Sequence, residues 1–415
     1  MSTPLRIVIF HLGFFYSGGG EKLVLQQARW LRARGHRVDV YAPIVDERAC
    51  FPDLLAEIGP RALLSRLPNV AGVGDALTLL MASLRASALT AGLDADVYLG
   101  ANQPGAWLAR AAARRHAKRY VVYLSQPNRL LLPRAIDREA RPLVMRNDFH
   151  LLFLAALVGR SVLDARDRAS VRDAAVRLGD GAYITTILRF YYGGGWRNCP
   201  AASAPLERSP VAVSARSGDS VRVNGILVRA PFILLTNRHY PQKRFEDMFP
   251  VLERVRRTNP GVTLVITGAE TQYTDRLRTE VAERGLSDAV LFLGLVPERD
   301  LEALYRAASV YVYPSPEEDF GMGIVEAMGR GTPVVAWDNA GPASIVVDGV
   351  SGRLAPLGDL ESFGGAVIEL LDDHKQADRI GAAAWEAAVR GYSAQAHTDV
   401  LERALQDAAT PSRPK

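Results

Sequence analysis

The chain has 415 residues, of which 48% are hydrophobic and 23% are charged, a composition typical of a folded globular protein rather than a disordered or fibrous one. The chain is longer than the number of residues that usually share one hydrophobic core, so two domains of roughly 200 residues each are favoured. Residues 1–230 hold 31 Lys and Arg against 18 Asp and Glu, a net charge of +13, whereas residues 231–415 hold 19 against 27, a net charge of −8. The asymmetry favours an anionic partner for the first half.

Several kinds of site and partner are not expected. Cys50 and Cys199 form no CxxC pair, and the histidines show no HExxH or related spacing, so neither a disulfide framework nor a metal site is predicted. The arginines are scattered with few aromatic residues between them, which disfavours a nucleic-acid surface. The amino terminus has no signal-peptide pattern, and the longest apolar run, residues 151–159, is under half of the about 20 residues that a spanning helix needs. A cytoplasmic protein is therefore expected.

Short β-branched or aromatic runs alternate with helical patterns along the chain. Helices are predicted at residues 20–35 and 298–308, and a last amphipathic helix at 393–409. The predicted strands are residues 5–12, 36–43, 95–101, 118–124, 231–237, 261–268, 289–294, 309–314 and 332–337. The alternation predicts parallel sheets with right-handed crossovers, and so an α/β fold of two doubly wound domains facing each other across a cleft.

The predicted domain boundary is the segment 193–230, which is rich in Gly, Ser, Ala and Pro and has weak periodicity. A first domain over residues 1–192 and a second over residues 231–392 follow from it. The terminal helix at 393–409 is expected to pack back on the first domain.

Three glycines, Gly18, Gly19 and Gly20, follow the first predicted strand and precede a helix. Backbone amides at such a helix start can bind a phosphate. The pattern is not GxGxxG, and no acidic residue is clearly placed to read a dinucleotide ribose, which argues against a nicotinamide dehydrogenase. A tight turn without a ligand is the alternative interpretation.

The stretch YLSQPNR places Gln126 and Arg129 after another strand of the first domain, on the side expected to face the cleft. Polar side chains in that position could contact a ligand. An ordinary surface loop is the alternative.

The stretch TNRHYPQKRF places Arg238 and Lys243 directly after the first strand of the second domain. Two cations at a strand end suit a leaving diphosphate, because negative charge grows on it as the bond breaks. A solvated loop is again the alternative.

The stretch SPEEDFGMGIVEAM puts Glu318 before a helix expected to begin near Phe320, and Glu326 inside that helix. Gly321 and Gly323 would let a ligand approach the backbone closely. Eight residues along a helix span about 12 Å, whereas the carboxyl pair of a retaining hydrolase lies about 5 Å apart. The spacing suits two acids that hold different parts of one extended ligand, unless the acids only complement the helix dipole.

Together these residues resemble glycosyltransferase family 4, whose retaining enzymes have the GT-B fold of two Rossmann-like domains. The family's signature, two Glu separated by seven residues, is matched by EDFGMGIVE from Glu318 to Glu326. Arg238 and Lys243 match its Arg-x4-Lys pair, and the glycines at 18–20 match its amino-terminal phosphate loop. DERACFPDL and EDFG are also similar to mannosyltransferases that use GDP-mannose on lipid-linked oligosaccharides.

The resemblance implies a role for each matched residue. Glu326 would hold the donor ribose and Glu318 the sugar hydroxyls, while Arg238 and Lys243 would stabilise the diphosphate. The backbone amides implied to help are those of Gly19, Gly20, Phe320, Gly321 and Met322. Such enzymes are thought to react by front-face attack, in which the leaving phosphate oxygen takes the acceptor's proton, so neither a cofactor nor a metal is expected.

Two departures from the family pattern concern the acceptor and the domain connection. Many relatives have a histidine where this chain has Gln126, and a glutamine can hydrogen-bond a sugar but cannot titrate. The interdomain segment also lacks the usual PNGVD form.

The expected activity is transfer of a hexose from a nucleotide diphosphate sugar to a lipid-linked or polysaccharide acceptor. Mannose is the favoured sugar, and GDP-mannose is favoured over a UDP-sugar as donor. The basic domain, with the apolar residues 149–158, is expected to rest on the anionic inner face of a membrane, unless those residues form a core helix. Alternatives are a nucleotide-sugar epimerase of the same fold and a nucleotide-sugar-binding protein without catalytic activity.

Overall fold

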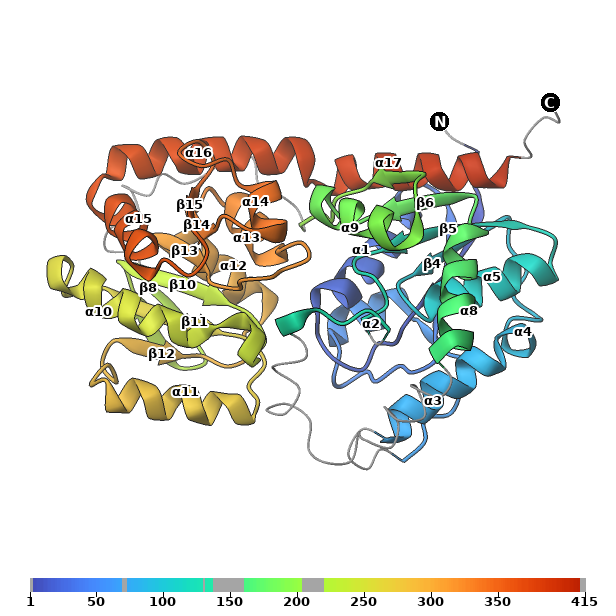
Figure 1. The fold of residues 1–415 in the computed structure, drawn as a ribbon, viewed down its shortest axis with the longest axis horizontal. Helices are drawn as coiled ribbons and strands as arrows, with labels where there is room; N and C mark the ends of the chain where they lie inside the picture. Colours follow the sequence, from blue (N-terminus) through green and yellow to red (C-terminus); the bar gives the residue numbers. More distant parts are fainter. Residues whose placement is uncertain (1–2, 69–72, 130, 137–159, 204–219, 411–415) are drawn as a thin grey trace. The chain divides into compact units, whose positions relative to one another are not determined.

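The computed structural model describes residues 3–68, 73–129, 131–136, 160–203 and 220–410. The apolar stretch 149–158 lies outside these residues. The chain divides into two compact units (Figure 1). Unit 1 contains Met1–Arg134, Met145–Ala201 and Ala394–Lys415, and the main part of unit 2 is Ala202–Ser393. Unit 2 also contains Ala135–Val144, so the crossings at Ala201 and Ser393 are two of those between the units.

Unit 1 is built on a seven-stranded sheet in the order β3-β2-β1-β4-β5-β6-β7, with every pair parallel. The strands are β1 Arg6–His11, β2 Arg37–Ala42, β3 Arg61–Ala62, β4 Val97–Ala101, β5 Arg119–Leu124, β6 Val176–Gly179 and β7 Trp196–Asn198. Strand order reverses between β1 and β4, and ligands of open α/β sheets bind beyond the carboxyl ends of strands at such a point.

Helices cover the sheet of unit 1. They are α1 Gly19–Ala33, α2 Pro52–Ile58, α3 Val73–Leu84, α4 Ala86–Leu89, α5 Gly105–Arg115, α8 Arg160–Arg172, α9 Ala182–Tyr192 and α17 Ala394–Ala409. The terminal helix α17 packs on α1 and on β4, β5 and β6 (Figure 1). Helix α5 packs so closely beside β1 that a Cβ at Gly105 would lie 2.4 Å from the Phe10 carbonyl oxygen. Only glycine allows this approach.

Unit 2 is built on a six-stranded sheet in the order β12-β11-β10-β13-β14-β15, also parallel throughout. Its strands are β10 Phe232–Thr236, β11 Thr263–Thr267, β12 Val290–Phe292, β13 Val310–Tyr313, β14 Val334–Trp337 and β15 Arg353–Ala355. Its helices are η3 Pro241–Lys243, η4 Phe245–Asp247, α10 Met248–Thr258, α11 Gln272–Glu283, α12 Glu298–Ala307, α13 Met322–Met328, α14 Ala340–Ile345, α15 Leu360–Asp372 and α16 His374–Gly391. Here strand order reverses between β10 and β13.

A small antiparallel hairpin precedes the sheet of unit 2, inside the segment 193–230 that weak periodicity marked as interdomain. It consists of β8 Ser220–Val223 and β9 Ile226–Arg229. Asn224 and Gly225 form its two-residue turn, both with positive φ, as the favoured hairpin turn requires. The Asn224 side chain donates to the carbonyls of Leu293 and Leu295, at 2.8 and 3.1 Å, which fixes the hairpin on unit 2.

Unit 1 contains a buried histidine that makes its stability depend on pH. His397 on α17 donates through Nδ1 to the Pro200 carbonyl at 2.7 Å, and its Nε2 lies 3.1 Å from the Gln27 side-chain nitrogen. A carbonyl can only accept, so this geometry suits a neutral ring that accepts from Gln27. Burial lowers the pKa of His397 from its ordinary 6.5 to about 4.

Acidification from about pH 6.5 towards pH 4 is therefore expected to destabilise the protein. The unfolded chain takes up the proton at the ordinary pKa whereas the folded ring does not, so His397 alone lowers the free energy of unfolding by about 1.4 kcal/mol per pH unit in this window. Urea unfolding at several pH values measures the slope. A His397→Asn variant, which has no titrating ring, should show a correspondingly shallower slope; identical slopes in the two proteins would contradict the assignment.

Within the described residues, no helix is both long and apolar enough to span a bilayer.

Candidate active site

The reversal point of unit 2 brings the predicted cations and acids of that unit to one edge of the sheet. Arg238 and Lys243 follow β10, and Glu318 follows β13, the strand hydrogen-bonded to β10. Their loops therefore leave the sheet side by side at its carboxyl edge.

The carboxylate of Glu318 is held on one oxygen by three side chains. Lys243 Nζ donates to Oε2 and forms an ion pair with it. Tyr313 Oη donates to the same oxygen at 2.7 Å, and Ser315 Oγ lies 3.5 Å from it. The Lys243 and Glu318 side chains are only 15% and 16% exposed, so this ion pair is screened less than a surface pair.

The acidic loop is fixed to the end of β14 and to the segment that follows it. Its carbonyls at alternate residues each accept one hydrogen bond, at distances of 2.7 to 2.8 Å. The bonds run from Trp337 Nε1 to Pro314, from Asn339 Nδ2 to Pro316, and from the Gly341 amide to Glu318. A Cβ at Gly341 would lie 2.5 Å from the Phe320 carbonyl oxygen, so only glycine allows this approach. The backbone of Glu318 is thus placed independently of its side chain.

The second acid, Glu326, lies on α13 and accepts from a buried tyrosine. Tyr305 Oη on α12 donates to Glu326 Oε2 at 2.9 Å, and it lies 2.8 Å from the hydroxyl of Thr236 at the end of β10. Thr236 also bonds Tyr311 Oη at 2.9 Å. A Cβ at Gly323 would lie 2.1 Å from that Tyr311 oxygen, so Gly323 is required for α13 to pack here.

The two tyrosines that donate to the acids remain protonated. Burial and the charge of Glu318 raise the pKa of Tyr313 well above its ordinary value. Burial and the charge of Glu326 do the same to the pKa of Tyr305. Both hydroxyls therefore remain hydrogen-bond donors to their carboxylates at neutral pH.

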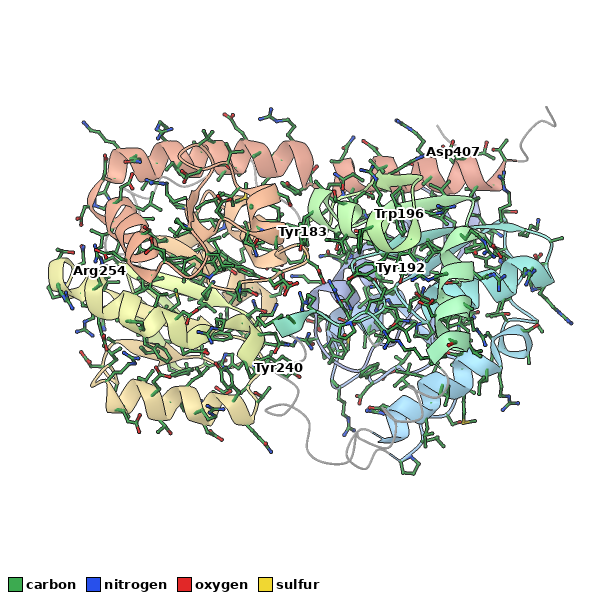
Figure 2. All side chains as sticks on the ribbon, viewed as in Figure 1. Tyr183, Tyr192, Trp196, Tyr240, Arg254 and Asp407 are labelled. Atoms are coloured by element: carbon green, nitrogen blue, oxygen red, sulfur yellow. The ribbon has the colours of Figure 1, made fainter. Side chains whose placement is uncertain are left out.

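Arg238 lies on a loop tied to the end of β11. The guanidinium carbon of Arg238 lies 5.2 Å from the ring centre of Tyr240, which Figure 2 labels. The next residue along, His239, donates its amide to the Ala269 carbonyl and accepts from Thr271 Oγ1 at 2.5 Å. Arg238 is half-buried.

The helix start expected near Phe320 lies two residues further along. Helix α13 begins at Met322, and its N-cap Gly321 has a φ of +109°, which favours glycine. Phe320 is buried, with its ring 5.9 Å from that of Tyr392. The amides of Gly321 and Met322 thus belong to the amino-terminal turn of α13.

In unit 1 the three glycines form the start of α1, the first helix after β1. Gly18 is the N-cap, and Gly19 and Gly20 are the first two helical residues. A buried pair supports this turn, since His11 Nε2 lies 3.4 Å from Glu21 Oε1 and His11 Nδ1 lies 3.2 Å from the Ala101 carbonyl. The helix start is thereby tied to the ends of β1 and β4.

Gln126 and Arg129 lie on the loop after β5, as the sequence predicts. Gln126 is exposed, and Arg129 donates to the Leu132 carbonyl at 3.4 Å. Between them, Asn128 donates its amide to Tyr192 Oη at 3.2 Å and its side-chain nitrogen to Asp167 at 3.1 Å. Tyr192, labelled at the end of α9 in Figure 2, donates to Asp167 at 2.6 Å. This buried network holds the loop in place.

The residues that support the acids are not among those predicted from the sequence. Tyr311 and Tyr313 lie two apart on a buried strand, so their side chains share one face and their hydroxyls need partners. That pattern, directly before an acidic loop, is a signal that could have identified Tyr313. Asp167 has no comparable signal, because its partners come from distant parts of the chain.

Among the described residues, no group of three or more His, Cys, Asp or Glu side chains is arranged to hold a metal ion.

Two family models match separate parts of the chain. Residues 17–160 match the family model for Glycosyltransferase Family 4, and residues 219–386 match that for glycosyl transferases group 1. The D-inositol 3-phosphate glycosyltransferase of Acidothermus cellulolyticus is 34% identical over 194 residues, which are 42% of this chain and 43% of the relative. The chain thus spans less than half of that relative.

A second relative covers more of the chain. The GDP-mannose-dependent alpha-(1-6)-phosphatidylinositol monomannoside mannosyltransferase of Mycobacterium tuberculosis is 27% identical over 337 residues, covering 72% of this chain and 84% of the relative.

Solved structures share the fold at low identity. HepE of Anabaena, in complex with UDP and glucose, has a TM-score of 0.70 and 18% identity, covering 97% of this chain and 99% of that one. Sucrose-phosphate synthase of Thermosynechococcus elongatus has a TM-score of 0.73 and 19% identity, covering 96% and 98%.

Proposed function

Because the chain belongs to glycosyltransferase family 4 and has the GT-B fold, we propose that it transfers mannose from GDP-mannose to a lipid-linked or polysaccharide acceptor with retention of configuration. Glycosyl transfer from a nucleotide sugar follows from the family. The sugar, the base and the acceptor are the proposed part.

The observation that carries the proposal is the pairing of Lys243 with Glu318 where strand order reverses in unit 2. A donor diphosphate gains negative charge as the glycosidic bond breaks. The attraction between that charge and a partly buried ammonium about 4 Å away is about 4 kcal/mol at an effective dielectric of about 20. When Lys243 turns towards that phosphate, the Glu318 carboxylate keeps a hydrogen-bond donor, because Tyr313 still donates to it.

The carboxylates supply acceptors for the hydroxyl groups of the donor. Glu318, oriented by Tyr313, would accept from sugar hydroxyls, and Glu326, oriented by Tyr305, from the ribose hydroxyls. A carboxylate that already holds one donor on Oε2 keeps lone pairs for further donors. The amides at the start of α13 and the Arg238 guanidinium complete the proposed contacts in this unit.

Unit 1 supplies the remaining proposed contacts. The amides of Gly19 and Gly20, at the positive end of the α1 dipole, would contact phosphate oxygens. Gln126 and Arg129 would contact the acceptor from a loop that Asn128 and Asp167 hold in place. Arg129 also offers a positive charge to an anionic acceptor.

Mannose and a lipid acceptor are favoured by the Mycobacterium tuberculosis relative, whose name gives GDP-mannose as donor and a phosphatidylinositol mannoside as acceptor. HepE contains UDP and glucose, but at 18% identity it supports only the fold. Action on a lipid-linked acceptor would place the protein at the inner face of the membrane.

A thermal-shift panel of GDP, UDP and ADP is expected to show the largest rise in melting temperature with GDP. A nucleotide at 100 times its dissociation constant adds about 2.7 kcal/mol to the free energy of unfolding. For a domain of about 200 residues, that corresponds to a rise of roughly 5–10 °C. Guanosine without phosphates is the control and should give little shift. A clear shift with UDP and none with GDP would contradict the mannose assignment.

A further inference from the structure

Helix α3 of unit 1 exposes a continuous apolar stripe. Leu77, Leu80, Met81 and Leu84 lie at i, i+3, i+4 and i+7, so their side chains share one face of the helix. Their exposed fractions run from 36% to 67%. The only charged residue of α3 is Asp75, which is paired with Arg66.

A basic pocket lies between the neighbouring helices α4, α5 and α8. It has a volume of about 640 Å³, and its polar lining includes Ser87, Arg110, Arg114, Arg115, Arg166 and Ser170. No carboxylate is among the described residues that line it. Arg110 is neutralised by Asp173, with contacts of 2.6 and 2.8 Å, which leaves a net positive charge from the other three arginines.

Arg166 joins the pocket to the apolar stripe. It donates to the backbone carbonyl of Ser83 on α3, and its guanidinium carbon lies 5.4 Å from the ring centre of Trp107. Burial and the nearby Arg110 lower its pKa, as expected for a cation without a carboxylate beside it. Arg166 thus connects the lining of the pocket to α3, and the stripe and the pocket are together termed below the α3–α8 patch.

We propose that the α3–α8 patch binds the surface of an anionic membrane, with the leucines and methionine of α3 inserted at the level of the headgroups and Arg114, Arg115 and Arg166 contacting lipid phosphates. An amphipathic helix lying in the interface with cations beside it has the chemistry that anionic bilayers attract. The binding does not depend on the transfer reaction, although it would bring unit 1 to a lipid-linked acceptor.

Charge decides between a lipid surface and a second copy of the chain. A symmetric dimer through this face would bring the uncompensated arginines of two copies together, and like charges oppose such an interface. Four side chains of one helix also offer far less apolar area than a stable dimer needs. A bilayer supplies both the apolar layer and the phosphates.

The test is flotation of the full chain with vesicles of phosphatidylcholine, alone or mixed with phosphatidylglycerol. The wild-type protein should float with the mixed vesicles and largely remain below with the neutral ones. Arg114→Gln with Arg115→Gln should weaken partition about 25-fold, since each cation near an anionic surface contributes about fivefold. Leu80→Ser with Leu84→Ser should weaken it by about tenfold or more, and added salt should weaken it further.

Matched variants separate the patch from general charge and hydrophobicity. Arg37→Gln with Arg403→Gln removes two exposed cations of unit 1 on other elements, and Leu295→Ser with Leu357→Ser removes exposed leucines of unit 2. Both should float like the wild type. The proposal is overturned if the patch variants also float like the wild type, if wild-type flotation needs no anionic lipid, or if the leucine pair instead abolishes a dimer seen by size exclusion. The rise in melting temperature with GDP, measured on the same patch variants, tests the proposed donor site independently of membrane binding.

Discussion

Replacing Lys243 with methionine is expected to lower kcat for sugar transfer by roughly 100- to 1000-fold, the range seen when one preorganised donor to a developing anion is removed. Lys243 ends η3 and donates to Glu318 from a position only 15% exposed, so its charge acts in a partly desolvated site. Methionine keeps the length of the stem and removes the ammonium. The loss should appear in kcat more than in KM, because the charge on the phosphate grows in the transition state.

Steady-state kinetics with purified donor and acceptor measure this change. Arg276→Met is the matched control, since it removes an exposed cation of unit 2 from α11 and should leave kcat within about twofold. Nucleotide-induced stabilisation should survive in the Lys243→Met variant if the fold and the ribose contacts are intact. A rise in KM with unchanged kcat would show that Lys243 binds the donor equally in the ground state and in the transition state.

Much of the architecture could be predicted because buried parallel strands leave a strong local pattern. All nine predicted strands are confirmed, from β1 at Arg6–His11 to β14 at Val334–Trp337, and the last helix is confirmed as α17. The carboxyl ends of parallel strands meet at one edge, so Lys243 and Glu318 could be predicted to lie close together, and the structure pairs them.

The missed elements are short or lie in atypical sequence. Strands β6, β7 and β15 have three or four residues each, and each of them contains an arginine, whereas the equally short β13 and β14 are apolar throughout. The β8–β9 hairpin lies in a segment dismissed as a linker, although its Asn-Gly turn is a strong local hairpin signal. Asp167 could not be found at all, because its role depends on Asn128 and Tyr192, 39 and 25 residues away in the chain.

Replacing Glu318 with glutamine should lower kcat by roughly 100-fold or more, because the amide keeps the shape of the side chain but loses the charge that pairs with Lys243. Tyr313 can still donate to the amide oxygen, so the loop should remain in place and the melting temperature should change little. Glu317→Gln is the matched control from the same acidic run. If both substitutions reduce activity by the same small factor, the acids only complement the dipole of α13.

A double-mutant cycle tests whether the lysine and the acid act as one unit. The effects of substituting two residues in direct contact are generally not additive. When two residues act together in catalysis, removing both lowers the rate little more than removing one. The Lys243→Met, Glu318→Gln protein should therefore be about as slow as the slower single variant. A loss equal to the product of the two single losses would mean that the two side chains act independently in the transition state, and that their ion pair has no role in the reaction.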